Sequence, residues 1–212
     1  VTSLDRTDSG RWRLACEPGP DVEADSVILA VPSFAAADLL ERLSPEAAAE
    51  LRAIDHASVA VVTLGYRPAA LPAHPDGAGF LVPRVDGRLT TACTWTTSKW
   101  PELRRGGMVL LRASAGRFGD DRPSAMDDPT LVGRLHEEMA EALGITEEPE
   151  TSLVDRWPRA FPQYAPGHAA RVDRIETAVR SLGAVLLAGA SYRGVGVAAC
   201  IRQGTDAATR AL

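Results

Sequence analysis

The 212-residue sequence has no long hydrophobic run. Its longest uncharged stretch, residues 181–192, is shorter than the roughly 20 apolar residues that cross a bilayer. Residues 1–10 lack the apolar core of a secretory signal. Basic residues are not in excess either: the sequence has 23 Lys and Arg and 28 Asp and Glu, which gives a net charge of −5. This negative charge argues against a nucleic-acid-binding protein. We expect a cytoplasmic protein with no transmembrane segment, and peripheral contact with a membrane stays open.

Cysteine and the common catalytic motifs are also scarce. The three cysteines, Cys16, Cys93 and Cys200, form no CxxC pair, which fits a reducing compartment and buried apolar thiols better than a disulfide framework. The four histidines form neither HxxxH nor HExxH, so we predict no metal site. The absence of a GxSxG elbow removes the signature of an α/β-hydrolase nucleophile.

The residue pattern that is present changes twice along the chain. Residues 1–55 predict a hairpin around Asp8–Gly10, a buried strand at 27–31 and two helices, the first capped by Ser33 and the second by Ser44. Residues 56–150 predict an antiparallel sheet and one helix capped by Asp128. The strand-like runs of this sheet are 57–66, 79–101, which forms a hairpin around Asp86-Gly87, and 108–116.

Residues 151–212 return to the first pattern, with a strand at 151–157, a loop at 159–168, a helix ended by Gly183, a strand at 184–189 and a last helix from about Gly196. This order predicts an α/β (α+β) fold. In it, the segment 56–150 is inserted into a discontinuous domain made of 1–55 and 151–212.

The last strand leads into a glycine-rich loop. Residues 194–199 read GVGVAA, which satisfies GxGxxG/A between a strand and a helix. A complete dinucleotide site also needs a second strand with an acidic end about 20 residues on, and too few residues follow Ala199 to build one. The local chemistry still favours an anion or a flat ligand, because glycine allows close approach and a helix start presents free N–H groups.

The loop before the penultimate helix holds further candidates for binding. Gln163, Tyr164 and His168 lie in a Pro- and Gly-broken stretch, where binding residues concentrate. His168 is the one acid–base candidate, although a satisfied loop histidine explains it better. Trp157 is either a core aromatic or a ligand contact, and Arg156 and Arg159 beside it are either solvated or anion-binding.

Several segments, in this order, resemble the flavin-dependent porphyrinogen oxidases of heme biosynthesis, which share the amine-oxidase-like FAD fold. They are ADSVILAVP, GFLVPR, ACTWTTSKWP, RASAGRFGD, RWPRAFPQYAPGH and LLAGASYRGVGVAACIRQG. TWTTSKWP with LLRASAGRFGD is most similar to the bacterial coproporphyrinogen type. The resemblance implies FAD contacts at Val1, Trp157, Val195, Gly196 and Val197. It also implies that Thr94, Trp95 and Lys99 lie on the antiparallel sheet that forms the porphyrinogen pocket.

The family also has an N-terminal GxGxxG unit for the FAD pyrophosphate, and this sequence has none. Because the chain also starts within a strand-like run at Val1, we expect it to be the downstream portion of a longer enzyme. The resemblance implies porphyrinogen and molecular oxygen as substrates, with coproporphyrin and hydrogen peroxide as products. The alternatives are a protoporphyrinogen oxidase, an amine oxidase of the same fold, and a catalytically silent truncated chain or interaction module.

Overall fold

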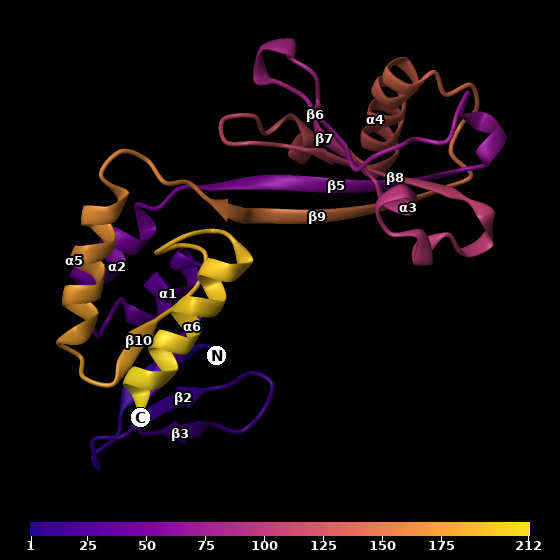
Figure 1. Ribbon diagram of the computed structural model, residues 1–212. Coiled ribbons are helices and arrows are strands. Elements are labelled where there is room, and N and C mark those ends of the chain that lie inside the picture. Colours follow the sequence, from indigo (N-terminus) through magenta and orange to yellow (C-terminus); the bar gives the residue numbers. More distant parts are fainter. The chain divides into compact units, whose positions relative to one another are not determined.

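The computed structural model describes the backbone of residues 1–212 and every side chain except that of Arg105. The chain divides into two compact units (Figure 1). Unit 1 consists of residues 1–56 and 161–212, and unit 2 of residues 57–160. Within the described residues, no helix has both the length and the apolar character needed to span a membrane.

Unit 1 contains two small sheets. The first has the order β1-β2-β3 and consists of β1 (Ser3–Arg6), β2 (Trp12–Ala15) and β3 (Val22–Ala24). Its first two strands form the hairpin that the sequence predicts, whereas β3 was not anticipated. The second sheet pairs β4 (Val27–Leu29) with β10 (Val185–Leu187) in parallel, as the short apolar run suggests. The expected burial on both faces is wrong, because Ile28 is 37% exposed and only Val27 and Leu29 are buried.

Unit 1 has four helices: α1 (Ser33–Leu40), α2 (Pro45–Arg52), α5 (His168–Arg180) and α6 (Val197–Ala211). The first three pack on its main core, and Ala207 of α6 packs in a separate small cluster with Leu186 and Ala188. Ser44 caps α2 as predicted, because its Oγ accepts from the N–H of Ala47. The predicted cap at Ser33 is wrong: Ser33 is already the first helical residue and its Oγ has no partner. The core includes Trp12, Leu40, Leu51 and Val172.

Unit 2 is built on a five-stranded sheet with the order β6-β7-β8-β5-β9. Its strands are β5 (His56–Tyr66), β6 (Gly79–Leu81), β7 (Thr90–Trp95), β8 (Val109–Ala115) and β9 (Thr151–Pro162). The β6-β7, β7-β8 and β8-β5 pairs are antiparallel, as predicted. The predicted loop at 159–168 is wrong in its first part, because β9 continues to Pro162.

Helix α4 (Asp128–Leu143) covers one face of this sheet. Leu131, Leu135 and Met139 pack on alternate residues of the central strands, Val62 and Leu111 among them. The predicted cap is one residue off, because Asp127 rather than Asp128 accepts from the N–H of Thr130. Gly144 ends α4 with a φ of 67°, where glycine avoids the strain of a left-handed conformation.

Candidate functional site

The loop from Ala188 to Gly196, called the glycine loop below, connects β10 to α6 in unit 1. Gly194 has a φ of +129°, and a Cβ at this position would lie 2.8 Å from the Cβ of Ala199. This residue therefore needs glycine for both its backbone conformation and its packing. At Gly196, in contrast, a Cβ would meet nothing within 4 Å, so the backbone faces open space in front of the helix.

The N-terminus of α6 is uncapped. No side chain bonds its first amides, and its first turn holds no acidic residue. Val195 and Val197, on either side of Gly196, are 51% and 77% exposed. Free N–H groups, a partial positive charge and exposed apolar side chains fit the edge of a flat cofactor that carries partial negative charge. The residues present therefore fit a flavin, at the positions Val195, Gly196 and Val197.

Tyr164 holds the glycine loop closed. Its hydroxyl donates to the carbonyl of Ala190 at 2.6 Å and accepts from the N–H of Gly194 at 2.9 Å. One phenol thus bridges the two ends of the segment 190–194. The pKa of this phenol is raised by burial, so the hydroxyl keeps the proton that it donates.

His168, the first residue of α5, supports this arrangement. Its ring stacks on Tyr164 with centroids 3.8 Å apart, and its Nε2 lies 3.0 Å from the carbonyl of Tyr192. A carbonyl only accepts, so Nε2 carries the hydrogen. The Nε2–H group of His168 is therefore already used in a hydrogen bond to the loop backbone. Tyr192 itself is buried, and burial raises the pKa of its phenol.

Charged side chains hold the outer side of the loop. The guanidinium of Arg193 binds Asp173 at 2.6 Å and Glu176 at 2.8 Å, both on α5, and these carboxylates raise the pKa of Arg193. The backbone N–H of Arg193 bonds Gln203 of α6. Gln163 is not part of this network, because its amide donates to the carbonyl of Phe161. Arg193 is thus committed to α5 rather than free for a ligand.

Unit 2 offers a second candidate surface, on the face of its sheet opposite α4. The register places Thr63, Arg112 and Thr94 side by side across β5, β8 and β7. The next row is Val61, Ser114 and Ala92. These six residues define what we call the second face. It combines small side chains with one exposed arginine that has no ion-pair partner among the described residues.

Trp157 belongs to the same face. A Cβ on Gly65 would touch Thr151, so the side chain of Thr151 projects from this face. Alternation along β9 then puts Leu153 and Trp157 there as well, with 61% and 55% exposure. Arg156 projects from the other face, where it binds Asp128 at 2.7 Å. Trp157 is therefore not a core residue of unit 2.

The other predicted contacts lie elsewhere. Trp95 follows Thr94 directly and so projects from the opposite face, against the α4 core. Lys99 lies in the short helix α3 (Thr96–Lys99), not on the sheet as expected, and its ammonium is 4.5 Å from the ring of Trp100. Val1 precedes β1 by two residues and is 59% exposed. Their roles in binding stay predictions.

Two features of these surfaces escaped the sequence analysis. Arg112 lies within the predicted strand at 108–116, and only the register of β7, β8 and β5 makes it the central cation of the second face. The bridging role of Tyr164 depends on a contact across 30 residues, which no local pattern shows. The described residues contain no group of three or more His, Cys, Asp or Glu able to hold a metal ion.

Comparison with known families gives a match along the complete chain. The family model described as flavin containing amine oxidoreductase matches residues 1–212. Coproporphyrinogen III oxidase of Bacillus subtilis is 36% identical over 213 residues, covering 100% of this chain and 45% of that protein. Protoporphyrinogen oxidase of Bos taurus is 33% identical over 222 residues, with the same two shares. The chain thus spans less than half the length of these relatives.

Solved structures agree with this match. A protein from an Exiguobacterium species, described as a protoporphyrinogen oxidase, superposes with a TM-score of 0.84 at 30% identity. The match covers 98% of this chain and 45% of that one. A putrescine oxidase superposes with a TM-score of 0.68 at 18% identity and shows the fold alone. The mixed helix-and-sheet fold is therefore amine-oxidase-like, as the sequence predicted.

Proposed function

This chain belongs to the flavin-containing amine oxidoreductase family, and on that premise we propose that it forms part of an FAD-dependent porphyrinogen oxidase of heme biosynthesis. The proposed reaction oxidises coproporphyrinogen III to coproporphyrin III. The observation that carries the proposal is the uncapped start of α6 beside Gly196, which suits an anionic flavin edge. The identity of 36% with the coproporphyrinogen III oxidase of Bacillus subtilis supports the choice of substrate.

In this proposal, the backbone N–H groups at Val197 and its neighbours hold the negative charge that the cofactor acquires. The helix dipole favours that charge, and no carboxylate in the first turn opposes it. Tyr164 and His168 keep the loop in the shape that aims these groups. A bound flavin supplies the acceptor for the hydride that leaves a carbon bridge of the tetrapyrrole.

We further propose that unit 2 is an inserted substrate-binding domain and that its second face receives the porphyrinogen. A porphyrinogen is large and apolar with carboxylate arms. Thr63 and Thr94 leave space over the strands, Trp157 offers an aromatic surface, and Arg112 between the threonines is suited to bind a carboxylate. Each oxidation step removes a hydride and a proton from the substrate. Molecular oxygen finally takes up both and is released as hydrogen peroxide.

The rest of the FAD site, in this proposal, comes from a segment of the same enzyme outside these 212 residues. The absence of a strand–GxGxxG–helix unit that could hold the pyrophosphate and the greater length of the relatives support this. Val1 and Trp157 would then contribute further cofactor contacts. We propose a cytoplasmic location, which the lack of a spanning helix in the described part of the chain allows.

Titration of FAD with the purified chain, followed by quenching of flavin fluorescence, tests the cofactor part. We expect saturable quenching that Gly196→Ala weakens about tenfold, because the methyl group enters the space that the flavin edge would use. The control is Gly204→Ala on the same helix, where a Cβ also meets nothing within 4 Å. Equal quenching in both variants contradicts the proposed loop contact, whereas absent quenching means that FAD binding needs the segment outside these 212 residues.

Porphyrin fluorescence tests the reaction. In the full-length enzyme with FAD bound, coproporphyrinogen III is expected to give a fluorescent porphyrin faster than protoporphyrinogen IX does. Arg112→Gln should lower the rate at limiting substrate more than the rate at saturation, because a carboxylate contact acts mainly on binding. A higher rate with protoporphyrinogen IX would reassign the substrate. Oxidation of an alkyl amine instead would favour an amine oxidase of the same fold.

A further inference from the structure

A hollow of about 400 Å³ lies at one end of the unit 2 sheet, between the turn that precedes β7 and the turn that follows β8. We call it the arginine hollow. Its lining residues are Arg84, Arg88, Arg117, Gly119, Asp120, Asp121 and Arg122. Four arginines against two aspartates leave a formal excess of two positive charges, in a chain whose net charge is −5.

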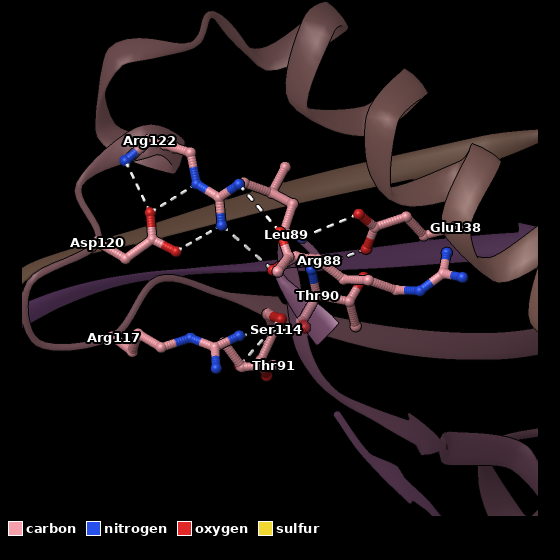
Figure 2. Close-up of polar contacts among 10 residues, drawn as sticks. Arg88, Leu89, Thr90, Thr91, Ser114, Arg117, Asp120, Arg122 and Glu138 are labelled. Carbon is pink, nitrogen blue, oxygen red and sulfur yellow. Dashed lines mark hydrogen bonds and ion pairs between the residues drawn. The ribbon is translucent and has the colours of Figure 1, made fainter. Parts of the chain in front are cut away.

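Two of the four arginines are committed to carboxylates. Figure 2 shows the guanidinium of Arg122 against both oxygens of Asp120, at 2.8 and 2.7 Å. Arg88 makes a bidentate pair with Glu141 at 2.6 and 2.8 Å. Arg122 also donates to the carbonyls of Gly87 and Arg88, so it ties one turn to the other. These two pairs build the wall of the hollow.

The other two arginines form no ion pair with a carboxylate among the described residues, although the charge of Arg117 adds to that of Arg122 in lowering the pKa of Asp120. The Nε of Arg117 is buried without any hydrogen-bond partner, and its Nη2 reaches the carbonyl of Thr90 only at 3.5 Å. The guanidinium of Arg84 makes no hydrogen bond within the described part of the chain, and a Cβ on Gly119 would be only 3.3 Å from its Nη2. A buried guanidinium nitrogen without an acceptor is costly, so an acceptor in the hollow would stabilise it.

The backbone around the hollow is fixed in advance. The carboxylate of Glu138 on α4 accepts from the N–H groups of Leu89 and Thr90, at 2.9 and 2.8 Å (Figure 2). On the other side, Gly119 has a φ of +76° within a turn closed by the hydrogen bond from Asp120 N to Arg117 O. Both turns are therefore held whether or not a ligand is present, which lowers the entropy cost of binding.

We propose that the arginine hollow binds an oxyanion, either a phosphate or a carboxylate group, held by Arg84 and Arg117. Guanidinium groups bind both kinds of oxyanion through paired N–H donors. The site uses residues of unit 2 alone and is distinct from the second face, because Ser114 and Arg112 project from β8 while Arg84 and Arg117 lie in the turns. The inference is independent of the proposed oxidase activity.

Amide and arginine side-chain NMR of the 212-residue chain tests this proposal, with chloride used to hold the ionic strength constant. One titration uses inorganic phosphate and the other uses citrate, which separates a phosphate source from a carboxylate source. We expect a saturable shift of the Arg117 Nε–H signal and of the Gly119 amide with at least one probe. Arg84→Ala, at an exposed position, should weaken binding about tenfold.

Two further variants keep the result interpretable. Arg117→Lys keeps the charge but removes the buried Nε donor, and it should also weaken binding about tenfold. Arg13→Ala, which removes an exposed arginine of unit 1, should leave the affinity unchanged. Shifts that grow linearly with both probes, or that fall equally in Arg13→Ala, would mean general charge screening and would overturn the proposal.

Discussion

Units 1 and 2 each fix a loop backbone with side chains, but with different chemistry. In unit 1 a phenol and an imidazole hold the glycine loop through Ala190, Gly194 and Tyr192. In unit 2 the carboxylate of Glu138 holds the turn at Leu89 and Thr90. Neither the phenol nor the imidazole is a carboxylate, and a carboxylate beside the start of α6 would compete with a bound anion. The turn in unit 2 is thus held at its backbone by a carboxylate, whereas carboxylates reach the glycine loop only through the side chain of Arg193, which binds Asp173 and Glu176.

Gly194→Ala should break the unit 1 arrangement with the largest effect. The methyl group would lie 2.8 Å from the Cβ of Ala199, on a backbone with a φ of +129°. We expect a loss of about 2–3 kcal/mol in the free energy of unfolding, measured by chemical denaturation. Gly196→Ala is the matched control and should stay within about 0.5 kcal/mol of the parent. Equal losses in the two variants would refute the assigned strain.

Glu138→Gln tests the carboxylate that holds the turn at Leu89 and Thr90 in unit 2. Burial raises the pKa of Glu138, but the hydrogen bonds from Thr90 and Leu89 outweigh it and leave the pKa below its ordinary 4.5. The stabilisation is therefore complete above that value and is lost as pH falls through the lower folded pKa. We expect the variant to lose about 1–2 kcal/mol at neutral pH. Its loss relative to the parent should shrink in acid.

Denaturation curves of both proteins at neutral and acidic pH measure this effect. Glu137→Gln is the control, since Glu137 is the exposed neighbour on α4 and its one described ion pair, with Arg134, spans 3.7 Å. A Glu138 variant whose deficit is the same at every pH would show that the carboxylate charge is not what holds the turn.

Tyr164→Phe tests the hydrogen bonds that hold the glycine loop in unit 1. It removes one hydroxyl and leaves the carbonyl of Ala190 and the N–H of Gly194 without that partner. We expect about 1 kcal/mol of lost stability, concentrated in the glycine loop and independent of acidic pH. Hydrogen exchange should show faster exchange at the Gly194 amide and no change at Thr90. A deficit that follows pH as in Glu138→Gln would erase the contrast between the units.

Arg193→Met should have the smallest effect. Arg193 binds Asp173 and Glu176, but its side chain is 41% exposed, so solvent screens both pairs. We expect a loss below about 1 kcal/mol that diminishes with added salt, measured by thermal unfolding at low and high ionic strength. A larger, salt-independent loss would mean that Arg193 stabilises the loop through packing rather than through its two ion pairs.

The parts of the fold that could be predicted from the sequence are those that depend on local chemistry. The cap at Ser44, the helix end at Gly144 and the alternation in β5 depend on neighbours within a few residues. The parallel partner of β4 and the extent of β9 depend on distant strands, so β9 was predicted too short. At Ser33 and Asp128 the helices were correctly expected and only the cap position was wrong.

The residues of the candidate site were likewise predictable only where the sequence pattern is local. The sequence indicated the glycine loop and its helix, because glycines between a strand and a helix form a local pattern. It did not distinguish Thr94 from Trp95, whose separation onto two faces follows from the strand itself once the register is known. It also grouped Tyr164 with ligand contacts, whereas its hydroxyl is used by the loop backbone.

The pairing of β4 with β10 has a consequence for the order of folding during synthesis. Val27 pairs with Val185, and the whole of unit 2 lies between them in the sequence. At a translation rate of about 5–20 residues per second, the ribosome needs roughly 8–30 seconds to make the intervening chain. Unit 2 is contiguous and can fold within that time, while the backbone groups of β4 wait for their partner. The pairing of β4 with β10 then closes a shorter flexible loop, because the middle part of the intervening chain is the folded unit 2.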